Sequence, residues 1–296
     1  MLPIWILEEV VRRALAEDVG TGDLTTNSLI PAGAGTEAFI HSKASGVLAG
    51  LPVAACVFHL LDAGVRVEEQ IPEGSPLRPG SVIARVKGPA RAVLTGERVA
   101  LNFLQRLSGI ATATRQLVDL IAGTRARLLD TRKTTPGLRA LEKYAVRVGG
   151  GCNHRIGLYD GILIKDNHIK VAGGITEAVK RARAAVPYTI KIEIEVENLE
   201  QLEEALAAGA DLIMLDNMPP PVLKKAVQLA GRRVPLEASG RITADRIRAV
   251  AETGVDFISV GAITHSAPAL DISMDVGAIK GVAGQPFDAD GKGKNP

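Results

Sequence analysis

The sequence predicts an α/β protein of two modules: a small N-terminal α/β or sandwich module and a C-terminal barrel of parallel strands, complete or open. From residue 126 onward, short aliphatic runs alternate with amphipathic segments every ~20 to 25 residues, which is typical of βα units with right-handed crossovers. Between residues 36 and 86, strand-like alternation is instead broken by Pro and Gly turns. A doubly wound open sheet is the alternative, but no Gly-x-Gly-x-x-Gly follows any predicted strand.

Composition narrows the class of protein. At 296 residues, with 46% apolar, 23% charged and only 3% aromatic residues, the chain is an ordinary globular protein with an aliphatic core. The formal net charge of +2 indicates no general affinity for nucleic acid or membrane, so any anion site must be local. No apolar run reaches the ~18 residues of a membrane span, and the start lacks a basic-then-apolar signal. We therefore expect a cytoplasmic protein.

The two cysteines are too few for a disulfide framework and are not spaced as metal ligands. Cys56 lies in an apolar helical run and is expected in the core. Cys152 precedes Asn153, His154 and Arg155, so a nucleophile is one interpretation. Because the sequence supplies no base and orienting group for it, we interpret Cys152 as a bystander.

The N-terminal module, residues 1–112, is expected to begin with an amphipathic helix and to end in a long helical linker. A glycine-punctuated loop should occupy residues 17–25. The linker is expected to be interrupted near Ser108-Gly109, and its charges, Arg98 among them, are interpreted as solvated surface. The expected helices cover residues 4–17, 52–61 and 90–122, and the expected strands cover 36–43, 65–70 and 82–86.

The barrel is expected in residues 113–266. The last segment, residues 267–296, should form mixed helix over 267–282, return toward the N-terminal domain and end in a frayed tail from residue 284. The expected barrel strands cover 126–130, 161–165, 189–196, 211–216, 234–238 and 256–260. The expected helices between them cover 138–147, 176–185, 199–208, 221–230 and 244–252.

The stretch from Asp130 to Gly137 stands where the first barrel strand should hand over to a helix. It contains two cations, Arg132 and Lys133, and three threonines. Backbone amides at a helix start, beside a guanidinium and an ammonium, form a site for a multiply anionic ligand. A basic surface turn is the alternative, and the residues that follow favour the anion site.

Every predicted barrel strand ends in a polar or charged group, which is where βα barrels place their chemistry. In the third strand, Lys191, Glu193 and Glu195 share one parity and the aliphatic residues share the other, so all three charges should point into the barrel. A solvated edge strand is the alternative, but the neighbouring strands are apolar until their ends. The other strand ends supply Arg132 and Lys133; Lys165, Asp166, Asn167 and His168; Asp216 and Asn217; Glu237, Ser239 and Gly240; and Ser259 and Gly261.

These groups indicate a phosphorylated ligand. Ser239, Gly240 and Gly261 lie near helix starts, where exposed amides can bind a terminal phosphate. Glu195 and Asp216 can hold a divalent cation or ribose hydroxyls, and hard carboxylate oxygens beside phosphate suit Mg²⁺.

Basic residues complete the expected site. Lys133 and Lys165 are expected to face phosphate, since a lysine ammonium is a compact point charge. Arg132, His154 and Arg155 are expected to bind an acidic substrate, because guanidinium pairs well with carboxylate. His168 is interpreted as a structural hydrogen-bonding residue.

Several stretches along the chain together match the pattern of a known family. They are Glu17-Asp18, Gly22 to Thr25, Gly96 to Asn102, Leu107 to Thr112, Thr131 to Gly137, Asn153 to Arg155, Lys165 to His168, Glu193, Glu195, Leu215 to Asn217 and Glu237 to Gly240. With these residues the chain resembles the quinolinate phosphoribosyltransferases (decarboxylating), also called nicotinate-nucleotide pyrophosphorylases. Of these stretches, only 131–137 and 165–168 are specific by themselves.

The resemblance implies an N-terminal α/β sandwich, a C-terminal open α/β barrel, and a homodimer, with or without assembly into a hexamer, whose subunits complete each other's sites. It implies a pentosyltransferase of NAD biosynthesis. Quinolinate and phosphoribosyl pyrophosphate, with Mg²⁺, would give nicotinate mononucleotide, pyrophosphate and CO₂. Arg98 would then reach the substrate carboxylate in the neighbouring subunit, which replaces its interpretation as surface.

The resemblance also implies residue roles. Quinolinate binding falls to Arg98, Arg132, Lys133, His154 and Arg155. Phosphoribosyl and phosphate binding falls to Lys165, Glu195, Asp216, Ser239, Gly240 and Gly261. The catalytic residues would be Lys133, Lys165, Glu195 and Asp216, with Glu195 and Asp216 also holding the metal, partly through the substrate. Arg241 departs from the family pattern, where Gly or Asn often stands, and it either strengthens phosphate binding or points outward.

Three alternatives stay open. A lysine-dependent aldolase or isomerase could form a Schiff base at Lys165 or Lys191, although the additional cations argue against it. A relative associated with molybdenum transport shares the fold. A non-catalytic phosphometabolite-binding protein is the third, but it would have little need of interior acids.

Overall fold

The computed structural model describes residues 3–277 of the chain. The residues form two compact units, one built from residues up to 112 together with those from 267 onward, the other from residues 113–266. Within residues 3–277, no helix is both long enough and apolar enough to cross a membrane. The tail expected from residue 284 lies outside the described residues.

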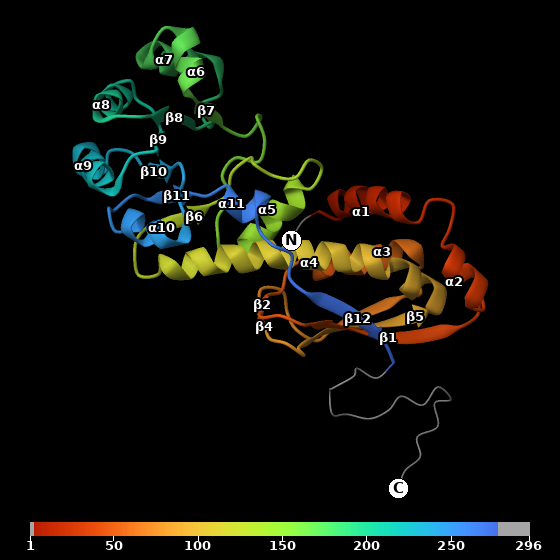
Figure 1. The fold of residues 1–296 in the computed structure, drawn as a ribbon. Coiled ribbons are helices and arrows are strands. Elements are labelled where there is room, and N and C mark those ends of the chain that lie inside the picture. The colour runs from red at the N-terminus through yellow and green to blue at the C-terminus, as the bar shows by residue number, and fades with distance from the viewer. Residues whose placement is uncertain (1–2, 278–296) are drawn as a thin grey trace. The chain divides into compact units, whose positions relative to one another are not determined.

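The first unit is layered around an antiparallel sheet with the strand order β12-β1-β5-β3. Helices α3 and α4 cover one face of this sheet, and α1 packs on α3 through Leu7, Val11 and Leu15, which recur at helical spacing (Figure 1). The strands are β1 (Gly35–Ser42), β2 (Gly46–Val47), β3 (Arg66–Glu69), β4 (Pro76–Leu77), β5 (Val82–Pro89) and β12 (Ile272–Val276). The helices are α1 (Ile4–Asp18), α2 (Leu24–Leu29), α3 (Leu51–Leu61) and α4 (Ala90–Leu120), which continues into the second unit.

The loop predicted over residues 17–25 is too long. Helix α2 begins at Leu24, and Asp23 caps it by accepting a hydrogen bond from the Thr26 amide at 2.9 Å. An aspartate before a six-residue helix is a weak signal beside the two glycines and the threonines around it, which favour a loop.

The interruption predicted near Ser108-Gly109 is also wrong, because α4 runs through both residues. A Cβ atom on Gly109 would lie 2.0 Å from the carbonyl oxygen of Pro268. The glycine therefore admits a neighbouring backbone segment and does not break the helix. Ser108 is buried and bonds both the amide and the carbonyl of Ala49.

The mixed helix predicted over residues 267–282 is wrong within the described residues. Strand β12 forms there and pairs antiparallel with β1. Ile272 and Met274 are buried, whereas Asp275 is exposed, which is the alternation of a strand. Such a short alternating run does not distinguish strand from helix, and the available edge of β1 decides the outcome.

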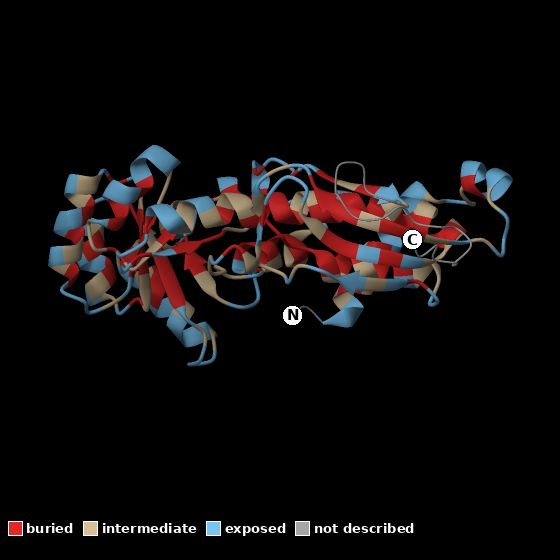
Figure 2. Ribbon diagram, turned by 90° about the horizontal axis from the view of Figure 1, so that it is seen from below, coloured by how far each residue is buried: buried red, intermediate tan, exposed pale blue. Residues whose placement is uncertain are grey.

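The second unit is built on six parallel strands in the order β6-β11-β10-β9-β8-β7, with helices outside them (Figure 1). The strands are largely buried and the outer helices carry the exposed residues (Figure 2). The strands are β6 (Arg127–Leu129), β7 (Ile162–Ile164), β8 (Ile192–Val196), β9 (Leu212–Asp216), β10 (Leu236–Ser239) and β11 (Phe257–Ser259). The helices are α5 (Arg139–Val148), α6 (Asp166–Ala172), α7 (Ile175–Ala185), α8 (Leu199–Ala207), α9 (Pro220–Ala230), α10 (Ala244–Ala251) and α11 (Ala262–His265).

Within residues 3–277, β6 and β7 do not pair, so the barrel is open. Only Cys152 extends the sheet beyond β6, through a single bridge to Leu129. The fold class expected from the sequence, a sandwich followed by an open α/β barrel, is confirmed. Helix α6 is an addition, because it starts at Asp166, directly after a predicted strand end.

Candidate active site

A cavity of about 750 Å³ opens at the carboxyl ends of the barrel strands. All the site residues predicted for the second unit line it: Arg132, Lys133, His154, Arg155, Lys165, Glu195, Asp216, Ser239, Gly240 and Gly261. Arg241 lines it as well. Parallel strands bring their carboxyl ends to one edge, so residues more than a hundred positions apart in sequence share this cavity.

Arginines supply much of the positive charge. Burial lowers the pKa of Arg155, and the nearby charge of Arg132 lowers it further, so two cations share a partly buried place. The Nε atom of Arg132 is buried and lacks a hydrogen-bond partner among the described residues. An anionic ligand would neutralise the two neighbouring cations and would accept a hydrogen bond from Arg132 Nε. Arg98 lies in the first unit, exposed on α4, and its contact with substrate in a neighbouring subunit stays a prediction.

The loop after β6 holds Lys133 by its backbone. The Lys133 amide donates to Thr131 Oγ1 at 3.0 Å, and Thr264 Oγ1 donates to the Lys133 carbonyl at 2.8 Å. Arg139 Nε donates to Thr134 Oγ1 at 2.9 Å and closes the other side of the loop. Helix α5 begins at Arg139, one residue after the predicted start at residue 138.

Behind this loop lies a buried network of Asp130, Lys143 and Asn153, which we call the closed cluster. Asp130 Oδ1 accepts from Lys143 Nζ at 2.5 Å and from the His154 amide at 2.8 Å, and Oδ2 accepts from Asn153 Nδ2 at 2.6 Å. Lys143 also donates to the His154 carbonyl at 3.2 Å. Burial raises the pKa of Asp130 and lowers that of Lys143, and their mutual contact opposes both shifts. The closed cluster thus joins the two loops that carry Arg132 and Arg155.

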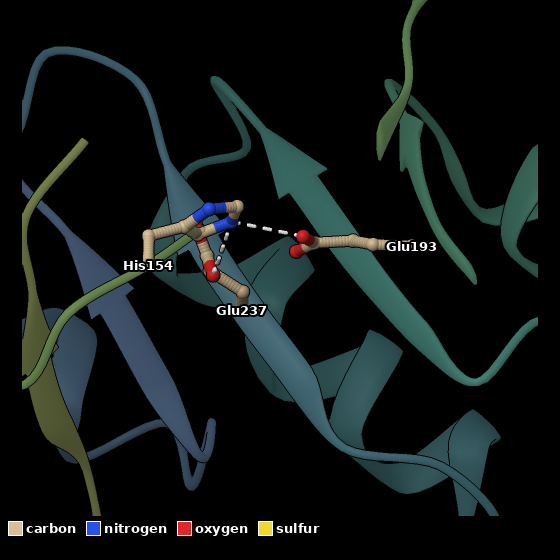
Figure 3. Close-up of side chains that lie close together, drawn as sticks. All are labelled: His154, Glu193 and Glu237. Atoms are coloured by element: carbon tan, nitrogen blue, oxygen red, sulfur yellow. Dashed lines mark ion pairs between the residues drawn. The ribbon is translucent and has the colours of Figure 1, made fainter. Parts of the chain in front are cut away.

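A second group, which we call the open cluster, consists of His154, Glu193 and Glu237 (Figure 3). His154 Nε2 lies 2.8 Å from Glu193 Oε2 and 3.6 Å from Glu237 Oε2, while Nδ1 accepts from the Arg155 amide at 2.8 Å. The two acids are 6% and 1% exposed. Glu193 therefore points into the barrel, as the strand parity predicted.

The open cluster has unusual acid–base properties. Burial, followed by the charge of Glu193, raises the pKa of Glu237 to about 8, so this carboxyl is protonated at neutral pH. For His154, burial disfavours the charged ring, but the hydrogen bond to Glu193 and the charges of both acids outweigh it and raise its pKa. The Arg155 amide at Nδ1 opposes a second ring proton.

Two tight turns form the expected phosphate-binding end of the cavity. Gly240 has φ +95°, and a Cβ atom on it would lie 2.3 Å from Asn217 Oδ1. The Asn217 amide donates to the Ser239 carbonyl at 2.9 Å, which joins the turns after β9 and β10. A Cβ atom on Gly261 would lie 2.9 Å from Lys133 Cδ. The left-handed backbone and the close contact with Asn217 require glycine at 240, whereas a side chain at 261 would have to displace the Lys133 side chain.

Glu195 and Asp216, the carboxylates that the sequence predicts as cation ligands, both line the cavity. Burial, followed by the charge of Asp216, raises the pKa of Glu195. Two neighbouring acids beside cavity space fit a hard divalent cation such as Mg²⁺. His154, Glu193 and Glu237 also offer three ligand atoms within 4.8 Å of one another.

Some cavity residues were missed by sequence reasoning. His265, from the short helix α11, lines the cavity, although no partner could be argued for it from the sequence. Leu163 and Met214 line the cavity as apolar wall, and their only sequence signal is that they share the strand parity of Lys165 and Asp216. Asn217, with φ +53°, is held left-handed beside Gly240.

Residues considered for other roles are also located. His168 Nδ1 accepts the Lys165 amide at 2.9 Å, which confirms its structural interpretation. The Lys191 side chain is 73% exposed, and its Nζ lies 3.9 Å from Asp211 Oδ1, at the opposite end of β8 from the cavity. Arg127 donates to Cys152 Sγ at 2.8 Å, and Cys152 does not line this cavity.

Comparison with protein families matches both parts of the chain. Residues 23–108 match the N-terminal domain of quinolinate phosphoribosyl transferase, and residues 110–275 match its C-terminal domain. A probable nicotinate-nucleotide pyrophosphorylase [carboxylating] of Bacillus subtilis is 51% identical over 270 residues, 91% of this chain and 93% of that protein. The nicotinate-nucleotide pyrophosphorylase [carboxylating] of Mycobacterium leprae is 45% identical over 274 residues, 90% of this chain and 96% of that protein.

Solved structures agree with these relatives. The nicotinate-nucleotide pyrophosphorylase of Francisella tularensis superposes with a TM-score of 0.90 at 45% identity, covering 93% of this chain and 98% of that one. The Ehrlichia chaffeensis protein of the same name gives 0.86 at 42% identity, covering 90% and 97%. The similarity therefore extends over both units.

Proposed function

Because the chain belongs to the quinolinate phosphoribosyl transferase family, we infer that it is a pentosyltransferase that transfers phosphoribose to quinolinate with decarboxylation. The substrates are quinolinate and phosphoribosyl pyrophosphate, and the products are nicotinate mononucleotide, pyrophosphate and CO₂. This reaction belongs to NAD biosynthesis. The name nicotinate-nucleotide pyrophosphorylase [carboxylating], which the relatives carry, describes the same reaction in the reverse direction.

The observation that best supports this reaction is that arginines and carboxylates line the same cavity. Arg132 and Arg155 suit the two carboxylates of quinolinate, because planar guanidinium binds carboxylate through two parallel hydrogen bonds. His154 and Lys133 complete this acceptor side. Ser239, Gly240 and Gly261 supply the close backbone approach that a 5-phosphate requires.

The chemistry follows from the charges at the strand ends. As pyrophosphate leaves, C1 of the ribose gains oxocarbenium character, which the carboxylates Glu195 and Asp216 stabilise electrostatically. Lys133 and Lys165 take up negative charge on the leaving group. The pyridine nitrogen of quinolinate is the nucleophile and carries no proton to remove, so no dedicated general base is needed. Mg²⁺, held by Glu195, Asp216 and the donor's phosphate oxygens, would supply further charge neutralisation on the pyrophosphate.

We further propose a homodimer, with or without assembly into a hexamer, in which Arg98 of one subunit binds the acceptor carboxylate in the other. Exposed apolar residues of the first unit support this proposal: Trp5 is 66%, Leu24 84% and Leu29 72% exposed. Such residues commonly mark an interface. A cytoplasmic location is part of the same proposal.

The test is to measure release of CO₂ and pyrophosphate from quinolinate, phosphoribosyl pyrophosphate and Mg²⁺, with nicotinate as the control acceptor. We expect both products in equal amounts with quinolinate and neither with nicotinate. Absence of both products from folded protein that binds phosphoribosyl pyrophosphate would contradict the assignment. It would also reopen the roles of Arg98, Arg132 and Arg155.

A further inference from the structure

Glu193 and Glu237 are buried acids that the reaction above does not use. Glu193 Oε1 and both carboxyl oxygens of Glu237 are buried without a hydrogen-bond partner among the described residues. Unsatisfied buried polar groups are costly, so they call for a functional explanation. Glu237 also lines two cavities, the 750 Å³ cavity at the strand ends and one of about 540 Å³, and His154 and Arg155 line both as well.

His154 has a partner at each ring nitrogen. The Arg155 amide points its hydrogen at Nδ1, so Nδ1 must offer its lone pair. The single ring proton then sits on Nε2, from which it is donated to Glu193 at 2.8 Å. Asp130 and Lys143 hold the backbone of His154 and not its ring. The orientation of the ring therefore depends on its own partners, the Arg155 amide at Nδ1 and Glu193 at Nε2.

A metal ion among His154, Glu193 and Glu237 is the competing explanation. Their ligand atoms are close enough for one. A metal on Nε2 would, however, force the ring proton onto Nδ1, where it would face the Arg155 amide hydrogen at 2.8 Å. Two donors cannot satisfy each other, so this contact favours a hydrogen-bonded arrangement.

We propose that Glu193 and Glu237 are positioning residues for the acidic acceptor: they fix the orientation and tautomer of His154 and, through its Nδ1, the Arg155 backbone. The proposal rests on the proposed binding of the acceptor by Arg132, His154 and Arg155. Glu193 provides the direct hydrogen bond. Glu237 Oε2 lies 3.6 Å from Nε2, so the Glu237 side chain limits the rotation of the ring.

Variants of Glu193 test this role. In Glu193→Leu the Nε2 proton loses its acceptor, and we expect the KM for quinolinate to rise about tenfold, while the KM for phosphoribosyl pyrophosphate changes less than about twofold. Glu193→Gln retains an acceptor oxygen and should rescue the KM for quinolinate to within about threefold of wild type. The matched control is Glu203→Gln, an exposed carboxylate on α8 that should change neither constant.

A second readout is independent of turnover. In ¹⁵N-histidine-labelled protein, with the His154 signals assigned from their loss in His154→Asn, we expect the Nε2–H tautomer in wild type and in Glu193→Gln. A mixture of tautomers is expected in Glu193→Leu. Thermal melting of each variant identifies any that fails to fold, and Glu193→Gln, the closest in shape, carries the test if Glu193→Leu does not fold.

Three outcomes would overturn the proposal. The first is an active wild type whose KM for quinolinate and His154 tautomer are both unchanged in Glu193→Leu. The second is an equal rise in the KM of both substrates. The third is stoichiometric Zn²⁺ or Mn²⁺ binding that Glu193→Leu abolishes and Glu203→Gln retains, which would establish a metal site. Lack of turnover by wild type would contradict the proposed function instead, and the tautomer measurement would still test the hydrogen bond.

Discussion

The closed and open clusters both contact His154, yet they differ in how many of their buried polar atoms have hydrogen-bond partners. In the closed cluster, both oxygens of Asp130, the Lys143 ammonium and the Asn153 amide nitrogen all have protein partners. In the open cluster, three of the four carboxylate oxygens of Glu193 and Glu237 have none among the described residues. A satisfied buried ion pair stabilises a fixed loop, whereas unsatisfied buried polar groups are kept where a ligand or a moving group needs them.

Removing the cation of the closed cluster should have the largest effect. Lys143→Met leaves the Asp130 carboxylate buried and uncompensated, which should lower the free energy of unfolding by about 3 to 5 kcal/mol in chemical denaturation. Lys224→Met, an exposed lysine on α9, is the control and should stay within about 0.5 kcal/mol of wild type. A loss no larger than the control's would break the distinction between the clusters.

Removing a cation that lines the cavity should have the reverse effect: quinolinate binding is weakened and the free energy of unfolding is little changed. Arg132→Ala removes a guanidinium whose Nε has no partner among the described residues, so we expect quinolinate affinity to fall about 10- to 100-fold. Unfolding free energy should change by less than about 1 kcal/mol, because no ion pair in the described part of the chain involves this residue. Isothermal titration with quinolinate measures the first quantity, and Arg78→Ala, exposed in the first unit, is the control. Unchanged quinolinate affinity would refute the role.

The protonation of Glu237 predicts a pH dependence of stability. Its pKa is about 8 in the folded protein against an ordinary value of 4.5, so the folded state holds a proton that the unfolded chain releases. This contribution is fully present below pH 4.5 and is lost as the pH rises through about 8. Wild type should therefore lose at most about 1.4 kcal/mol of unfolding free energy per pH unit in this window, relative to Glu237→Gln.

Denaturation of both proteins between pH 5 and pH 9 measures this difference. Glu203→Gln, an exposed acid, should show no such trend. A constant difference between wild type and Glu237→Gln over the whole range would mean that Glu237 is ionised throughout and that the open cluster carries a full buried charge.

The smallest effect is expected at Ser259, whose buried Oγ has no partner among the described residues. Ser259→Ala removes a hydroxyl that makes no close hydrogen bond, although it is near enough to Glu237 to lower the pKa of that carboxyl, so the unfolding free energy should change by less than about 0.5 kcal/mol. Asn153→Leu, which removes a bonded amide from the closed cluster, should cost about 1 to 3 kcal/mol. Equal costs in thermal melts would show that bonded and unbonded buried polar atoms contribute alike here.

Local sequence patterns were enough to predict much of the barrel and of its candidate site. The alternation in β8 placed Glu193 and Glu195 inside the barrel, and the polar groups at the strand ends marked the residues that line the cavity. These patterns can be read without knowing which segments pack together, because strand parity and the position of strand ends are properties of the backbone. The prediction failed where a distant segment decides the local structure. Gly109 was predicted to interrupt α4, but it makes room for the backbone of Pro268. Strand β12 forms because it pairs with the edge of β1.

Periodicity and composition were enough to predict the fold class, the order of the barrel strands along the chain and the residue types at the strand ends, since these follow from the geometry of one strand or one helix. They did not show which buried acids would be paired. Asp130 contacts Lys143, whereas Glu237 lies beside Glu193 and the ring of His154. These groups come from strands, loops and helix α5, which are distant in sequence, and their distances are set by how those elements pack together.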